Sequence, residues 1–258
     1  MASETEFEGG KRFTLRIAGM SADTFAAVNL SGEERISHSW WFELDLVSEQ
    51  KDLRFQDALR KSATIEILAQ GGSRTTYHGV VTRFQQLQEV DQQALYRARV
   101  EPWMTNAREQ VQSEVFLNKT VPAIIDSVFK DSGLSVNDYQ LRLTGDVNTR
   151  SYEYLCQYEE SDLNFLQWLL EDNGVYYFFE DDGATEKAVF ANSKTAQGGA
   201  TRKLTYKPIS GTETDVNLEN SVQRISRKPE GGHACAEARA QGHHPRPLPA
   251  QGHHEDDS

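Results

Sequence analysis

The sequence has few cysteines, no long hydrophobic run and no recognisable export signal. Only 2 of its 258 residues are cysteine, and this excludes a small fold stapled by several disulfides. Cys156 lies in a strand that is expected to be buried, and Cys235 lies in a low-complexity tail. No stretch approaches the about 18 consecutive apolar residues of a membrane-spanning helix. The N-terminal residues MASETEFEGG lack the basic and then apolar pattern of a signal peptide. These absences predict a chain that folds in a reducing cytoplasm and does not insert into a membrane.

Positive charge is also in short supply. The chain has 27 lysines and arginines against 39 aspartates and glutamates, a net charge of −12. Phosphate binding needs a basic face, so nucleic acid is excluded as a partner. The sequence contains no Gly-rich phosphate loop, HExxH, GxSxG or CxxC motif. We therefore expect no catalytic residues, no cofactor and no metal site, which argues against an enzyme.

The first hundred residues have the pattern of short strands. Phe13, Leu15 and Ile17 alternate with polar residues, and the turn sequence Gly71-Gly72-Ser73 suggests a hairpin. Segments 77–84 and 94–100 flank a polar loop and predict a second hairpin. Several antiparallel strands joined by polar or Gly-rich turns favour a β-barrel or sandwich.

Segment 120–131 predicts a helix. Thr120 is a suitable N-cap, Pro122 falls in the first turn where its missing N–H costs nothing, and Gly133 follows the last turn. The apolar positions recur at helical spacing and form one stripe: Val121, Ile124, Ile125, Val128 and Phe129. This stripe should pack against a neighbouring layer.

The most informative stretch is 150–180, RSYEYLCQYEESDLNFLQWLLEDNGVYYFFE. It predicts a strand with an aromatic face, then a helix with Ser161 as N-cap and Asp162 adding negative charge at its positive end. Gly174 follows the helix as a C′ residue. The aromatic run 175–179 then predicts a second strand.

These motifs resemble a known family. The string QYEESDLNFLQWLLEDNGVYYFF at 157–179 is similar to the signature of VgrG proteins, the spike of the bacterial type VI secretion system, and of baseplate hub proteins of contractile-tailed phages. YHGVVTRF, YRARVEPW and the 116–133 segment follow the family's order and spacing. The residues that match the motif, interpreted as fold determinants, are Gln157, Tyr158, Ser161, Asp162, Phe165, Leu166, Gly174, Tyr177 and Phe178.

The resemblance implies an α+β, mainly β fold with a tail-tube-like antiparallel β-barrel. It implies a structural hub: a homotrimer that caps the hexameric Hcp tube, contacts baseplate components, delivers effectors and leaves the cell through the type VI apparatus. A phage or prophage tail hub is the alternative within the same architecture. A hydrolytic effector is the remaining alternative, for which no residue constellation is present.

The domain prediction has four parts. They are a first barrel (1–104), an inserted α/β region (105–206), the start of an incomplete second barrel (207–228) and a tail (229–258). The tail holds five of the seven histidines, and the tetrapeptide QGHH occurs in it twice. It has almost no large aliphatic side chain that could form a core, so disorder is expected. The abrupt change in composition gives the hypothesis that residues from about Pro229 onward are translated out of frame.

Two tryptophans have two interpretations. Trp40 and Trp41 fit an interface between subunits, where tryptophan is enriched, and they equally fit core packing. The sequence leaves both open.

Overall fold

The computed structural model describes residues 13–68, 74–183 and 185–196, together with the backbone of 205–206, 221–230 and 233–241. The chain divides into two compact units. The larger consists of Phe13–Glu66 and Thr76–Gln197, and the described strands after residue 198 belong to the smaller.

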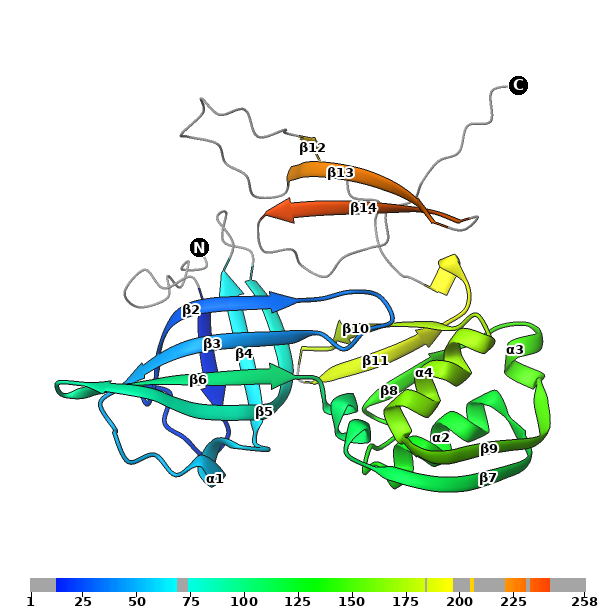
Figure 1. Ribbon diagram of the computed structural model, residues 1–258, viewed down its shortest axis with the longest axis horizontal. Coiled ribbons are helices and arrows are strands. Elements are labelled where there is room, and N and C mark those ends of the chain that lie inside the picture. The colour runs from blue at the N-terminus through cyan, green and yellow to red at the C-terminus, as the bar shows by residue number, and fades with distance from the viewer. Residues whose placement is uncertain are drawn as a thin grey trace, which may run out of the picture. The chain divides into compact units, whose positions relative to one another are not determined.

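A six-stranded sheet forms the first part of the larger unit (Figure 1). Its order is β1-β4-β5-β6-β3-β2. The strands are β1 (Phe13–Ile17), β2 (Ala26–Glu33), β3 (Trp41–Ser48), β4 (Ser62–Leu68), β5 (Arg74–Val90) and β6 (Gln93–Glu101), with the short helix α1 (Phe55–Ala58) before β4. The sheet curls into a half-barrel, which confirms the predicted mainly-β, tube-like fold class.

The curl of this sheet follows from alternation and from bulges. Along β3, every second side chain is buried, and Leu44 and Leu46 lie opposite Ala98 and Tyr96 of β6. The β5–β6 pairing shifts register twice, at Val81/Arg83 and Gln86/Gln88. Such bulges increase local strand twist, so they help a long hairpin to bend around its apolar face.

The second part of the larger unit is an α/β region of three layers (Figure 1). Its elements are η1 (Trp103–Arg108), β7 (Val111–Thr120), α2 (Val121–Asp131), β8 (Tyr139–Arg142), α3 (Asp146–Thr149), β9 (Ser151–Ser161), α4 (Asp162–Asp172), β10 (Tyr176–Asp181), β11 (Glu186–Ala191) and η2 (Lys194–Ala196). Strands β7 and β9 form an antiparallel ribbon. Strands β10, β11 and β8 form a mixed sheet.

Aromatic pairs connect the three layers. Phe116 of β7 stacks on Phe165 of α4, with ring centroids 5.4 Å apart. Phe129 of α2 lies 5.5 Å from Phe190 of β11, and both rings are fully buried. Helices α2 and α4 therefore pack between the ribbon and the mixed sheet, and the apolar stripe predicted for 120–131 faces both.

The predicted helix caps are present. The Thr120 hydroxyl accepts a hydrogen bond from the Ala123 N–H (3.4 Å), and Pro122 lies in the first turn of α2. The Ser161 hydroxyl accepts from the Asn164 N–H (3.3 Å) at the start of α4. Each cap satisfies one of the amide donors that a helix N-terminus leaves without an intrahelical partner.

Gly174 ends α4 with a left-handed backbone, and its replacement tests this turn. Its φ is +63°, and a Cβ at this position would meet nothing within 4 Å. Gly174→Ala should lower the free energy of unfolding by about 1–2 kcal/mol because only the backbone conformation is penalised. Gly174→Asn is the matched variant and should cost less, since asparagine tolerates this conformation. Urea denaturation measures both, and equal stability of wild type and Gly174→Ala would contradict the turn assignment.

Strand β9 faces the opposite way from the sequence interpretation of Cys156. Leu155 and Gln157 are buried against the helices, whereas Tyr154, Cys156 and Tyr158 are exposed. The expectation that Cys156 is buried is wrong. Alternation shows that a strand has two unlike faces, but the packing of α2 and α4 decides which one is covered.

Strands occur both in the segment expected to start a second barrel (207–228) and in the tail for which disorder was expected (229–258). In the smaller unit, β12 (Thr205–Tyr206) pairs parallel with β13 (Ser221–Glu230), and β13 pairs antiparallel with β14 (His233–Gln241). Residues 207–220 of the expected second barrel lie outside the described residues. Segment 233–241, HACAEARAQ, alternates alanine with larger residues, and a backbone ladder needs no large side chain to form.

Candidate functional site

The α/β signature is organised around one buried carboxylate, that of Asp162. Its Oδ1 accepts hydrogen bonds from Gln112 Nε2 and Gln157 Nε2, both at 2.8 Å. Its Oδ2 accepts from the Ser132 hydroxyl at 2.8 Å. The side chain is fully buried, and its own backbone N–H donates to the Gln110 carbonyl (2.9 Å).

This carboxylate connects four elements. Gln112 belongs to β7, Ser132 is the C-cap of α2, Gln157 belongs to β9, and Asp162 is the first residue of α4. A buried carboxylate is stable only when charged or polar donors surround it, and here three side chains donate. The arrangement holds helices and ribbon together. Because both carboxylate oxygens are engaged by neutral donors of the fold, it has the chemistry of a structural centre.

The other residues of the sequence signature lie in three environments. Phe165, Leu166 and Tyr177 are buried core residues, and Phe178 is half-buried. Ser161 and Gly174 bound the helix. Tyr158 is different because its side chain is 70% exposed, so the structure shows no packing role for it within this chain.

Trp40 and Trp41 lie in different environments. Trp40 is fully buried, and its Nε1 donates to Glu186 Oε2 at 3.0 Å. Its ring also contacts Phe42, Tyr77 and Phe179, with centroids 5.4–6.5 Å apart. Trp40 therefore belongs to the core where the half-barrel meets β10 and β11. Trp41 is half-buried beneath the Arg99 guanidinium, which lies 4.4 Å from the ring centroid.

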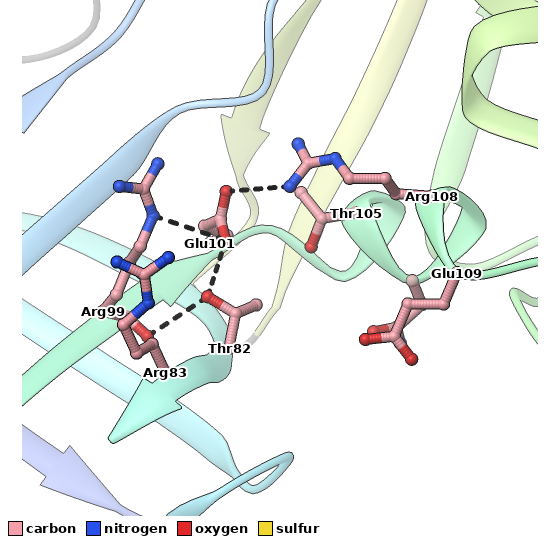
Figure 2. A pocket seen from close by; sticks show the side chains of 8 residues that line it. Thr82, Arg83, Arg99, Glu101, Thr105, Arg108 and Glu109 are labelled. Carbon is pink, nitrogen blue, oxygen red and sulfur yellow. Dashed lines mark hydrogen bonds and ion pairs between the residues drawn. The ribbon is translucent and has the colours of Figure 1, made fainter. Parts of the chain in front are cut away.

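A polar hollow of about 310 Å³ lies where β5 and β6 meet η1 (Figure 2). It is lined by Thr82, Arg83, Arg99, Glu101, Thr105, Asn106, Arg108 and Glu109. At its centre, Glu101 Oε2 accepts from the Thr82 hydroxyl (2.6 Å) and lies 3.5 Å from Arg99 Nε. Glu101 Oε1 lies 3.5 Å from Arg108 Nη1, as the dashed lines in Figure 2 show.

Both carboxylates that line this hollow are paired with arginines. Glu101 is buried and contacts two arginines, while Glu109 pairs with Arg60 at 2.5 Å. No histidine, lysine or cysteine is among the lining residues, and the Glu101 carboxylate is already engaged by the Thr82 hydroxyl and two arginines. These contacts link β5 and β6 of the half-barrel to η1 of the α/β region.

A cross-strand cluster on the half-barrel gives a pH-dependent prediction. Arg97 Nε donates to Asp45 Oδ1 (2.7 Å), and Asn29 Nδ2 donates to Asp45 Oδ2 (3.2 Å). The Arg97 hydrogen bond lowers the pKa of Asp45 below its ordinary value. Stability from this cluster is therefore present above about pH 4 and is lost as pH falls through the lowered folded-state pKa.

Urea denaturation of wild type and Asp45→Asn tests this dependence. At pH 7 the variant should be less stable, by up to about 1 kcal/mol for a partly exposed pair. The difference should shrink when the measurement is repeated at progressively lower pH. A difference that stays constant down to the acid limit of folding would show that the ionised carboxylate contributes nothing.

Metal and membrane features are absent from the part of the chain that the structure describes. Among those residues, no three His, Cys, Asp or Glu side chains form a group that could hold a metal ion. None of the described helices combines the length and apolar character needed to cross a bilayer. The paired histidines of the two QGHH repeats lie outside the described residues.

Comparison with known proteins identifies the fold. A profile of the phage tail baseplate hub family (GPD) matches residues 33–234. The chain belongs to this baseplate hub family. The match covers the half-barrel from the end of β2, the whole α/β region and the start of β14, so it includes the Asp162 centre and the Glu101 hollow.

Relatives of this baseplate hub chain are named as secretion spike proteins. It is 31% identical over 195 residues to the type VI secretion system spike protein VgrG1a of Pseudomonas aeruginosa, covering 74% of this chain and 30% of that protein. It is 30% identical over 224 residues to VgrG5 of the same organism, covering 84% and 28%. The resemblance to VgrG and phage hub proteins is thus confirmed. The hub chain spans about a third or less of the length of these relatives.

Solved structures show the same fold. An Escherichia coli component of the type VI secretion system, described as similar to the bacteriophage T4 tail proteins gp27 and gp5, matches with a TM-score of 0.70 at 23% identity. The match covers 84% of the hub chain and 56% of that protein. A tail protein of Neisseria meningitidis matches with a TM-score of 0.51 at 12% identity, covering 84% and 59%.

Proposed function

We propose that this baseplate hub chain is the hub part of a type VI secretion spike. Three copies form a ring that caps the hexameric Hcp tube, contacts baseplate components and leaves the cell with its effectors when the apparatus fires. The observation that carries the proposal is the similarity to P. aeruginosa spike proteins at 30–31% identity over most of the chain. A curled antiparallel sheet suits a ring because its copies can continue one another's curvature.

The internal organisation supports a mechanical role. Asp162 and Glu101 are buried carboxylates whose donors come from different elements, so each ties several segments together. Trp40 and Glu186 connect the half-barrel to the α/β region. A part that transmits force needs such rigid connections and large complementary surfaces, and needs no reactive group. We accordingly propose no catalytic function for this chain.

A binding experiment tests the proposal. The purified chain should form a species of three times its 29.1 kDa mass in native mass spectrometry, and it should bind hexameric Hcp end-on in negative-stain images. A chain that remains monomeric at high concentration and binds no Hcp would overturn the hub assignment. Trp41→Ala is informative here, because the interface interpretation of Trp41 expects weaker trimerisation of a variant that remains folded.

A phage or prophage tail hub is the second candidate function. The matching profile is that of phage tail baseplate hubs, and a bacterial tail protein shares the fold. The same experiment separates the two, with the tube protein of a contractile phage tail replacing Hcp. Binding to the phage tube protein with no binding to Hcp would favour the tail hub.

A further inference from the structure

The outer face of the β7–β9 ribbon is apolar and exposed. It presents Val111, Val115 and Leu117 from β7, and Tyr154 and Tyr158 from β9, with exposed fractions of 48–70%. These are five of the twelve large hydrophobic side chains that are exposed in the described part of the chain. Contiguous exposed apolar side chains mark interaction sites more often than isolated ones do. We call these five residues the ribbon face.

The ribbon face is contiguous around Val115, Leu117 and Tyr154, while Val111 lies beyond a register shift between Gln112 and Glu114. Leu117 lies directly opposite Tyr154, and Val115 lies opposite Cys156, between the two tyrosines. The alternate residues point inward, where Phe116 and Leu155 are buried against the helices. Only the inward residues of the two strands pack in the core. The exposed tyrosine, valine and leucine side chains on the outer face have no packing role within the described part of the chain.

Charge around the ribbon face is predominantly acidic. Strands β7 and β9 together carry Glu114, Glu153, Glu159 and Glu160 against a single cation, Lys119. Burial raises the pKa of Glu114, and the nearby carboxylates of Asp131 and Asp162 act in the same direction to a smaller extent. An acidic ribbon face would repel the same face of a second copy, whereas a basic partner would be attracted.

The ribbon also has open strand edges. Among the described strands, β7 and β9 pair only with each other, which leaves one hydrogen-bonding edge of each strand available. Figure 1 shows the ribbon on the outside of the α/β region, with α2 and α4 on its other side. An extended segment can add to such an edge through main-chain hydrogen bonds while its alternate side chains contact the face.

We propose that the ribbon face docks an extended segment of another protein, in which apolar residues alternate with lysine or arginine. The apolar side chains cover Leu117 and Tyr154, and the basic ones lie near Glu159 and Glu160. The proposed contact involves β7 and β9 of the α/β region and no strand of the half-barrel.

A peptide titration tests the proposal on the full chain. The probe is a ten-residue peptide of alternating valine and lysine, and its control alternates valine and glutamate. Calorimetry should show saturable binding of the lysine peptide and no binding of the glutamate peptide. The affinity for the lysine peptide should fall as the salt concentration rises from about 0.1 to about 0.5 M, because salt screens the charges. The double variant Leu117→Ser/Tyr154→Ser should weaken binding by about tenfold or more.

A matched variant separates this face from general charge attraction. Val28→Ser/Val90→Ser removes two side chains that are similarly exposed, at 56% and 54%, on the half-barrel. It should leave peptide affinity within about twofold of wild type, because binding energy concentrates in the contact centre. Glu159→Gln/Glu160→Gln should weaken binding and reduce its salt dependence. Thermal melting checks that each variant remains folded.

Several outcomes would overturn the proposal. They are binding of neither peptide, equal binding of both, or binding of the lysine peptide that Leu117→Ser/Tyr154→Ser leaves unchanged. Self-association that this double variant abolishes would also overturn it, because the face would then be an interface between copies. The hub function is measured separately by Hcp binding, which the double variant should retain, so failure of one idea is distinguishable from failure of the other.

Discussion

Asp162→Ala should lower the free energy of unfolding by about 3–5 kcal/mol, the cost of breaking a buried, hydrogen-bonded charge network. The carboxylate accepts from three side chains on three different elements, and all of its surface is buried. Alanine removes the carboxylate that accepts these hydrogen bonds, so the Ser132 hydroxyl and the Gln157 amide lose this acceptor in the protein interior. The melting temperature should fall by about 10 °C, given about 2–4 °C per kcal/mol at this size.

Asp162→Asn and a surface control sharpen this prediction. Asparagine keeps the volume and one acceptor oxygen but points an amide donor at other donors, so its cost should be intermediate. Asp57→Ala removes an exposed carboxylate paired with Arg54 and should change stability by less than about 0.5 kcal/mol. Chemical denaturation at pH 7 gives all three values. If Asp162→Ala were no worse than Asp57→Ala, the network would not be a determinant of the fold.

Trp40→Ala should cost about 3–5 kcal/mol, the usual range for removing a fully buried large aromatic side chain. The ring lies among Phe42, Tyr77 and Phe179, and its N–H donates to Glu186 across the connection between half-barrel and α/β region. Removing it leaves a cavity at that connection. The two parts should therefore lose cooperativity as well as stability.

The neighbouring tryptophan is the natural control for this experiment. Trp41→Ala removes a half-buried ring and its contact with the Arg99 guanidinium, and should cost about 1 kcal/mol. Trp40→Phe keeps an aromatic ring and loses the Glu186 hydrogen bond, so its cost should lie between the other two. Differential scanning calorimetry reports both stability and cooperativity. A larger loss for Trp41→Ala than for Trp40→Ala would reverse the assignment of core and surface.

The local elements of the α/β region were predictable from sequence. The caps Thr120 and Ser161 and the turn residues Gly133 and Gly174 act within a few residues of their own position, and the structure shows each in its predicted role. The apolar stripe of α2 is buried as its spacing indicates. These features depend on backbone geometry and short-range hydrogen bonds, which a sequence window contains.

The roles of single side chains within those elements were less accessible. Asp162 was expected to favour the helix N-terminus through its charge, and Gln157 was one motif residue among nine. Their partnership with Gln112 and Ser132 joins residues up to 50 positions apart. Gln112 lies between Val111 and Ser113, and nothing in this pattern indicated that its side chain would donate to Asp162.

The last segment of the chain shows the limit of composition as a guide. Sparse aliphatic residues after Lys228 suggested disorder, yet His233–Gln241 in this tail forms β14, which pairs with β13. The family match also continues to residue 234. Sequencing the coding DNA in all frames past codon 228 remains the direct test of the out-of-frame hypothesis, because a second frame that encodes a longer hub would support it.

The sequence by itself determined the family, the mainly-β class, and the capped helix between two strands, because periodicity, caps and turns are encoded over short distances. The tertiary structure alone decided that Trp40 is core, that Asp162 is a buried acceptor for three elements, and that β9 turns its tyrosines outward. Those outcomes depend on which faces of distant segments pack together. The burial of a side chain and its hydrogen-bond partners arise from contacts between segments, so the sequence of one segment does not determine them.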